Sequence, residues 1–208
     1  MLFFVGPIRQ SLMAVVLATL LVASVALAQP AAERPSVKVG DTWELQVKKR
    51  TVQSAASSGS RRVVEVSEDR VKIARKTGNG ETLITYDRSF NEIEACHPEC
   101  YRPTFQFPMR LGNKWEFERK TPDNGTRQTG TYEVVKYESI TVPAGTFDCF
   151  RVDGDYKATR SHVLHTYWYC PQINAVARQI VERRISGQYG PGQYDYDESE
   201  LVRFTPGP

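Results

Sequence analysis

The sequence predicts an all-β fold: a curved antiparallel meander of about ten strands, forming a half-barrel or open barrel with little helix. Three observations predict it. Short segments of alternating polar and apolar residues follow one another, turn residues separate them, and no window of helical length places apolar residues on one helical face. The composition, with 40% hydrophobic and 11% aromatic residues in a chain of 208, also argues against a disordered or coiled-coil protein.

Residues 1–28 are typical of a secretory signal peptide. Arg9 precedes a nearly all-apolar run from Leu12 to Leu27, and Ala26-Leu27-Ala28 places small residues where signal peptidase reads them. The run is shorter than the ~20 apolar residues that a membrane-spanning helix needs. We therefore expect cleavage after Ala28, an exported protein that is periplasmic or secreted, and no integral membrane segment after cleavage.

The remaining chain is expected to comprise a linker, residues 29–36, and a single β domain, residues 37–208. Proline and alanine dominate the linker. The expected strands are Thr42–Arg50, Arg61–Glu68, Arg70–Lys76, Glu81–Asp87, Trp115–Thr121, Thr126–Tyr137, Phe147–Tyr156, His162–Cys170, Ala175–Arg184 and Glu200–Phe204. Turns that contain Gly and Asn, at 77–80 and 122–125, connect two pairs of these strands into hairpins.

A short motif occurs twice in the domain. Lys38–Leu45 (KVGDTWEL) matches Arg110–Phe117 (RLGNKWEF) in its basic, apolar, Gly, Asp-or-Asn, Trp and Glu positions. Each copy is expected to form a turn that leads into a strand, with Trp43 or Trp115 as the first inward residue. The repeat favours a domain built from two related halves.

The four cysteines are expected to form two disulfides, because an exported protein folds in an oxidising compartment. The segments 147–156 and 162–170 should pair as an antiparallel hairpin in which the numbers of facing residues add up to 319. That register produces one largely apolar face and sets Cys149 directly opposite Cys170, within reach of a disulfide. A slip by one residue would destroy both features together.

By elimination, Cys96 pairs with Cys100 across His97-Pro98-Glu99. A metal or redox site is the alternative for these residues and stays open at this point. Structural zinc usually takes a second pair of ligands, and a redox motif has two residues between its cysteines, so we expect a structural disulfide and no metal.

Two motifs resemble a group of bacterial exported β-rich proteins that have no assigned function. They are V-G-x-x-W, here Val39–Trp43, and T-V-P-A-G-T-F-x-C, here Thr141–Cys149. The resemblance spans roughly residues 37–204 and implies a curved antiparallel sheet, similar to that of the periplasmic lipoprotein carriers that bind acyl chains. The chain departs from those carriers in lacking clear amphipathic helices to plug the concave face, and no catalytic residues carry over.

Aromatic side chains are the candidate ligand-binding residues. The segment 186–197 (SGQYGPGQYDYD) repeats Gly-Gln-Tyr, and its rings could lie flat on a sugar or an apolar ligand; the alternative is an ordinary connection between the last two strands. Together with the tryptophans, the candidates are Trp43, Trp115, Trp168, Tyr189, Tyr194 and Tyr196.

The leading functional hypothesis is an exported, non-enzymatic β-protein that binds an apolar or amphipathic ligand of the cell envelope, such as a lipid, in its concave sheet. The net charge of +3 is too balanced for a nucleic-acid-binding protein, and the chain contains no recognisable catalytic or cofactor-binding motif. We therefore expect no cofactor. The alternatives are a structural or protein-interaction module that binds an envelope protein and, third, an uncharacterised hydrolase.

Overall fold

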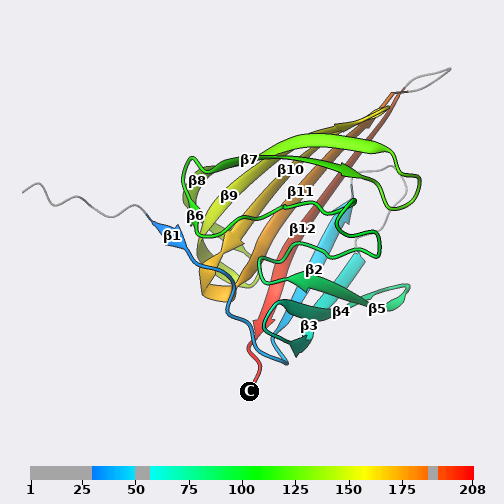
Figure 1. Ribbon diagram of the computed structural model, residues 1–208. Coiled ribbons are helices and arrows are strands. Elements are labelled where there is room, and N and C mark those ends of the chain that lie inside the picture. The colour runs from blue at the N-terminus through cyan, green and yellow to red at the C-terminus, as the bar shows by residue number, and fades with distance from the viewer. Residues whose placement is uncertain (1–29, 50–56, 187–191) are drawn as a thin grey trace, which may run out of the picture.

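The computed structural model describes residues 30–49, 57–186 and 192–208, so the predicted signal peptide lies outside the described residues. The elements are β1 (Ala31–Ala32), β2 (Thr42–Lys49), β3 (Ser57–Val66), β4 (Arg70–Thr77), β5 (Gly80–Asp87), β6 (Met109–Arg110), β7 (Lys114–Lys120), β8 (Arg127–Val142), β9 (Gly145–Ala158), β10 (Ser161–Cys170), the 3₁₀-helix η1 (Pro171–Ile173), β11 (Ala175–Ile185) and β12 (Gln193–Thr205). Ten of the strands form one antiparallel sheet that curves without closing into a barrel (Figure 1). The predicted all-β fold is confirmed.

The sheet consists of two meanders joined side by side. Its strand order is β5-β4-β3-β2-β12-β11-β10-β9-β8-β7, so the first long strand, β2, pairs with the last one, β12. At this junction Trp43 faces Phe204, and their rings stack with centroids 5.8 Å apart. A single sequential meander would leave its first and last strands at the edges. Here both lie in the middle, and β5 and β7 form the edges.

The β9–β10 hairpin has the register that the sequence predicts. In every facing pair from Phe150–Tyr169 to Ala158–Ser161, the two residue numbers add up to 319. Both strands are longer than expected, so the turn between them consists of only Thr159 and Arg160. The disulfide between Cys149 and Cys170 continues the same register, with 4.2 Å between their Cα atoms.

The two copies of the repeated motif make the same backbone hydrogen bonds. Gly40 and Gly112 have φ angles of +97° and +82°, a region that glycine adopts without strain. Each donates its N–H to the carbonyl of a valine on the next strand, Val63 or Val134, and that valine donates back to the residue after the glycine. A β-bulge follows each valine. We infer that one way of starting a strand is used twice in the fold.

Two residues of the segment expected to be a linker pair with a strand of the domain. Ala31 and Ala32 pair with β6, and the side chain of Ala32 is buried beside that of Met109. Farther on, the Ser36 N–H donates to Asn174 Oδ1 at 3.1 Å. Two paired residues are too few to produce an alternating pattern, so this strand could not be predicted from the sequence.

The connection between β5 and β7 crosses the concave face of the sheet (Figure 1). We call its residues 88–108 the plug. Phe105 and Phe107 pack on Tyr169, with ring centroids 6.1 and 5.1 Å away, and Phe90 lies edge-on to Trp43 at 6.3 Å. An irregular segment therefore covers part of the concave face (Figure 1).

Candidate functional site

A small apolar cavity lies on the concave face between the plug and the sheet. Its volume is about 60 Å³, and Trp43, Leu45, Ile73, Tyr86, Phe90 and Phe105 form most of its lining. Arg61 is the one charged side chain among the described residues that line it. A mainly apolar hollow with few polar groups is typical of sites that bind small molecules.

A second hollow, of about 170 Å³, lies on the same strand, β2. Val47 and Val181 line it together with the polar residues Gln179, Asp197 and Ser199. Val47 follows Leu45 by two residues, so both side chains lie on one face of β2. The concave face therefore offers an apolar hollow beside Trp43 and a more polar one farther along β2.

Trp43 is held in one orientation by three contacts. Its side chain is 3% exposed and lies between Phe204 and Phe90, and its indole N–H donates to the Ile173 carbonyl at 2.9 Å. With its polar atom satisfied, the indole presents only apolar surface to the cavity.

A chain of polar side chains extends from the plug into the concave interior. Arg102 donates from Nη1 to the Tyr156 hydroxyl at 3.0 Å, and that hydroxyl lies 3.1 Å from His165 Nε2. The other ring nitrogen of His165, Nδ1, is hydrogen-bonded to the Tyr167 hydroxyl. Tyr156 accepts from Arg102, and its own proton can be donated to Nε2; in that arrangement the ring proton of His165 lies on Nδ1.

The buried His165 is neutral at physiological pH. Burial, followed by the charges of Arg102 and Arg183, lowers its pKa from 6.5 to about 3. A neutral imidazole bonded to two phenols, with no serine or cysteine among its hydrogen-bond partners, is suited to orienting neighbouring groups.

His165 should make the protein less stable in acid. Below pH 6.5 the unfolded chain protonates this histidine while the folded chain does not, so stability falls as the pH drops from 6.5 towards 3. At pH 4.5 the loss from this residue should be about 2–3 kcal/mol relative to pH 7.5. Urea unfolding at both pH values should show a smaller acid loss in His165→Gln than in the parent. A matched change at the exposed His97, His97→Gln, should leave the loss unchanged; an unaltered loss in His165→Gln would contradict the assignment.

The five aromatic candidates that lie in the described residues are not brought together at one site. Trp43 lines the cavity, whereas Trp115 is buried elsewhere in the concave core, where its indole N–H donates to the Pro103 carbonyl at 2.5 Å. Tyr194 is 51% exposed on β12, and its hydroxyl donates to Glu182. Tyr196 lies on the same face of β12, and its hydroxyl donates to Glu198 at 3.3 Å. Tyr189 lies outside the described residues.

Trp168 lies on the other side of the sheet from the plug. It alternates with Tyr167 and Tyr169, which contact Phe105 on the concave side. Arg151 and Arg178 lie over its ring, with guanidinium carbons 5.8 and 5.2 Å from the centroid. These cations cover the indole, which is only 9% exposed.

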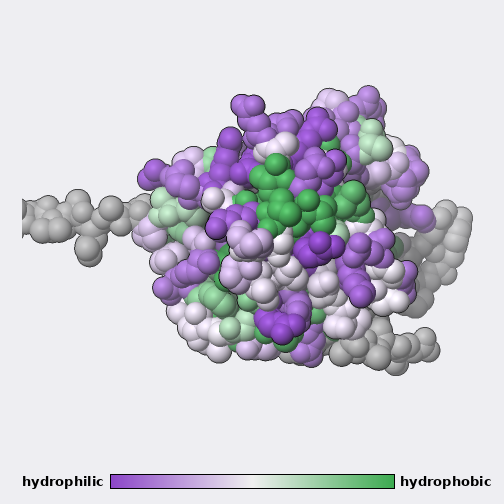
Figure 2. All heavy atoms as spheres, turned by 90° about the horizontal axis from the view of Figure 1, so that it is seen from below, coloured by the Kyte–Doolittle hydropathy of each residue, from purple (hydrophilic) through white to green (hydrophobic). Residues whose placement is uncertain are grey.

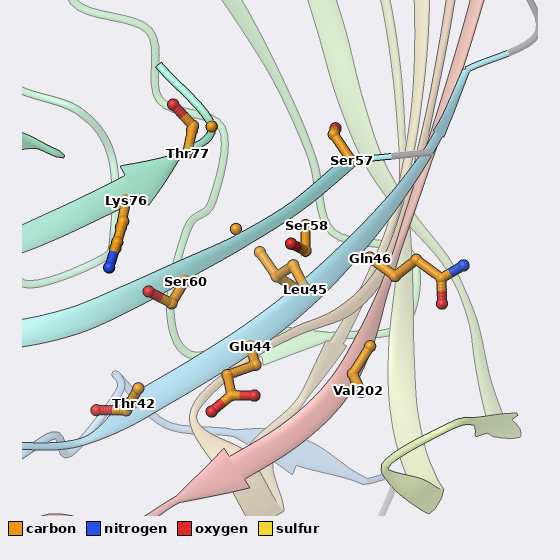
Figure 3. Close-up of a pocket in the computed structure, with 12 residues that line it drawn as sticks. Thr42, Glu44, Leu45, Gln46, Ser57, Ser58, Ser60, Lys76, Thr77 and Val202 are labelled. Atoms are coloured by element: carbon orange, nitrogen blue, oxygen red, sulfur yellow. The ribbon is translucent and has the colours of Figure 1, made fainter. Parts of the chain in front are cut away.

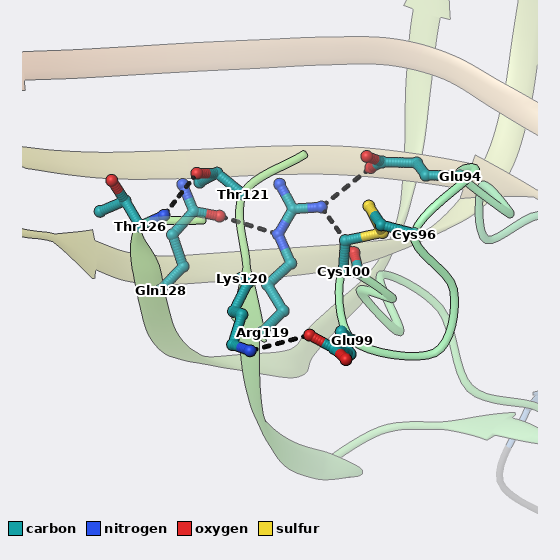
Figure 4. Close-up of a disulfide and its surroundings, with 9 residues drawn as sticks. All are labelled: Glu94, Cys96, Glu99, Cys100, Arg119, Lys120, Thr121, Thr126 and Gln128. Atoms are coloured by element: carbon teal, nitrogen blue, oxygen red, sulfur yellow. Dashed lines mark hydrogen bonds and ion pairs between the residues drawn. A yellow bond between two sulfur atoms is a disulfide. The ribbon is translucent and has the colours of Figure 1, made fainter. Parts of the chain in front are cut away.

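The second disulfide, Cys96–Cys100, closes a small loop that is attached to β7 (Figure 4). Arg119 donates to the Cys100 carbonyl at 3.0 Å and pairs with Glu94 at 2.9 Å, and Lys120 pairs with Glu99 at 2.8 Å. Glu94, Cys96 and Cys100 lie close enough together to hold a metal ion. The two sulfurs are bonded to each other, however, and a metal would need them as thiolates.

A larger groove, of about 900 Å³, crosses strands β2, β3, β4 and β12 (Figure 3). Most of the described residues that line it have polar side chains: Thr42, Ser58, Ser60 and Thr77 contribute hydroxyls, and Glu44 and Lys76 contribute charges. Glu44 also forms an ion pair with Arg203. The residues that line this groove include no aromatic ring on which a sugar could stack.

Apolar side chains also gather on the outside of the molecule. Figure 2 shows a contiguous group of them, bordered by polar residues, on the face seen from below. None of the helices in the described part of the chain has the length and hydrophobicity to span a membrane.

Two features of the site could not be predicted from the sequence. The plug contributes Phe90 and Phe105 to the cavity. In the sequence, these positions are marked only by bulky aromatic residues in a segment that has no periodic pattern. Arg61 appeared only as the first residue of a strand, and its position inside the cavity depends on the register with β2.

No protein-family model and no curated protein sequence matches the chain. Several solved structures are similar to this chain over most of its length. A provisionally assigned lipoprotein from Parabacteroides distasonis has a TM-score of 0.46 and 14% identity over 85% of this chain and 100% of its own. A provisionally assigned exported protein with a YmcC-like fold from Bacteroides fragilis has a TM-score of 0.46 and 15% identity over 84% and 99%. The hypothetical lipoprotein YmcC from Escherichia coli has a TM-score of 0.43 and 10% identity over 80% and 85%.

Proposed function

We propose that the protein is exported and acts as a binding protein, without catalysis, for an apolar or amphipathic ligand of the cell envelope. The observation that carries the proposal is the apolar cavity between plug and sheet, in which Trp43 and Phe105 face the same hollow. Export is supported by the signal-peptide pattern and by two disulfides, which persist in oxidising compartments.

The geometry suits the end of a hydrocarbon chain. A cavity of about 60 Å³ is too small for a whole lipid but large enough for the tip of an alkyl chain. The remainder of the ligand would extend out of the cavity along the concave face. Of the six aromatic candidates, Trp43 is the one to which this proposal assigns direct ligand contact.

A cavity-filling variant tests the proposal. Ala175 lines the cavity, so Ala175→Leu should occupy the space that an alkyl chain would take. We expect calorimetry to show that dodecanol binds the parent protein and binds Ala175→Leu at least ~10-fold more weakly. Ala144→Leu, which makes the same change in the β8–β9 turn, is the control and should bind like the parent.

Native mass spectrometry of the protein purified from its own host provides an independent measurement. A co-purifying apolar molecule, reduced in Ala175→Leu, supports the proposal. Equal dodecanol binding by the parent and Ala175→Leu, or no binding by either, would rule out the concave cavity as a ligand site.

A further inference from the structure

We propose that the ligand of the concave cavity carries an anionic group, a carboxylate or a phosphate, which is bound by Arg61 and Arg75. This inference rests on the proposed function and specifies the class of ligand.

The two arginines lie in one row across the sheet. Arg61 on β3 faces Trp43 on β2 on one side and Arg75 on β4 on the other, and Thr82 of β5 follows Arg75. Directly opposed residues of antiparallel strands point to the same face. Both guanidinium groups therefore lie on the concave face, and Arg61 also lines the apolar cavity.

Two like charges in directly opposed positions destabilise a sheet unless another charge compensates them. Within the described part of the chain, no carboxylate forms an ion pair with Arg61 or Arg75. Six other arginines there do have such a partner: Arg70, Arg119, Arg127, Arg151, Arg178 and Arg203. The pair in the row is thus a concentration of positive charge with no carboxylate bonded to it.

The surroundings of Arg61 make it energetically unfavourable to leave its charge unpaired. Its side chain is half-buried and borders an apolar hollow, where an unpaired ion is poorly solvated. Both arginines also act on Tyr86 in that hollow. Burial raises the pKa of this tyrosine, the two cations oppose the rise, and Glu92 adds to it. Glu92 is exposed and is not ion-paired to either arginine.

An anionic ligand would satisfy these groups. A guanidinium can hold a carboxylate or a phosphate through two parallel hydrogen bonds, and two guanidiniums side by side can share one anion. The hollow beside Val47 is lined by Asp197 and Glu198 of β12, which would repel an anion. The anionic group would therefore bind on the β3–β4 side, with its alkyl chain directed towards Trp43.

Ligands with one tail and different head groups test the inference. We propose calorimetry of the full exported chain with dodecanol, dodecanoate, dodecyl phosphate and dodecyltrimethylammonium, each below its micelle concentration. At least one anion should bind about 10-fold more tightly than dodecanol, and the cation more weakly. Tighter binding of dodecanoate would indicate a fatty acid, and tighter binding of dodecyl phosphate a phospholipid-type head.

Single substitutions test whether Arg61 and Arg75 cause the preference for an anionic head group. Arg61→Gln should remove the preference for the anion while dodecanol binding persists, and Arg75→Gln should reduce the preference. Arg62→Gln is the matched control, because Arg62 is exposed on the opposite face of β3 and the substitution changes the net charge equally. The salt dependence of dodecanoate binding should also weaken in Arg61→Gln and persist in Arg62→Gln.

The outcomes separate the two proposals. If dodecanol binds but the anions bind no more tightly, or if Arg62→Gln removes the preference as Arg61→Gln does, the arginine pair is not an anion site although the binding function stands. If none of the four compounds binds the parent protein, both proposals fail.

Discussion

Replacing Asn91 by alanine is expected to lower the free energy of unfolding by about 3–5 kcal/mol. Asn91 is 2% exposed and joins the start of the plug to its later part. Its Nδ2 donates to the Phe105 carbonyl at 2.9 Å and to the Tyr101 hydroxyl at 3.1 Å, and its Oδ1 accepts from the Phe105 N–H at 2.8 Å. Alanine would leave both backbone groups of Phe105 buried without these partners.

Urea unfolding followed by circular dichroism measures this change. Tyr101→Phe is the graded control, because it removes one hydroxyl at the border of the same network and should cost only about 1 kcal/mol. If Asn91 contributed little to the plug, Asn91→Ala and Tyr101→Phe would have similar small effects. That result would overturn the view that Asn91 holds the two parts of the plug together.

The disulfide between β9 and β10 should contribute more stability than the one in the plug. Changing Cys149 and Cys170 together to serine should cost about 3–4 kcal/mol, against about 2 kcal/mol for the same change at Cys96 and Cys100. The first pair closes the longer loop, 21 residues apart against 4. Both of its cysteines are also fully buried, so serine would place hydroxyls in an apolar cluster.

The small loop has other attachments that survive loss of its disulfide. Lys120 binds Glu99 through both its backbone N–H and its side chain, and Arg119 holds the Cys100 carbonyl. Chemical denaturation of the two double-serine variants under identical conditions provides the comparison. Equal midpoints for the two variants would refute the ranking.

The sequence could predict local pairing but not the neighbours of distant strands. Alternation between apolar and polar residues, together with Cys149 and Cys170, was enough to determine the β9–β10 register. Nothing comparable connects β2 with β12, because alternation tells which face a residue occupies and not which strand lies beside it. Trp43 was therefore recognised as an inward residue, while its stacking partner Phe204 was not.

The candidate site was predictable only in its regular part. Trp43 lies on a strand and follows the period-2 pattern, so it could be found from the sequence. Phe105 belongs to the plug, whose position depends on hydrogen bonds to Asn91 and has no periodic signature. Arg61 was missed because a charged residue at the start of a strand ordinarily faces solvent, and only the registers with β2 and β4 place it beside the cavity.

The pairing of β2 with β12 at the centre of the sheet also determines at which stage of synthesis or export the fold can be completed. The C-terminal segment is attached across the junction, where the Gly207 N–H donates to Asp41 Oδ1 at 2.7 Å, 166 residues away in sequence. A ribosome or an export channel delivers the chain from its N-terminus, so β2 keeps one unpaired edge until the last strand emerges. The sheet can therefore be completed only after residues 193–205 have emerged, and truncation within these residues would affect the centre of the fold.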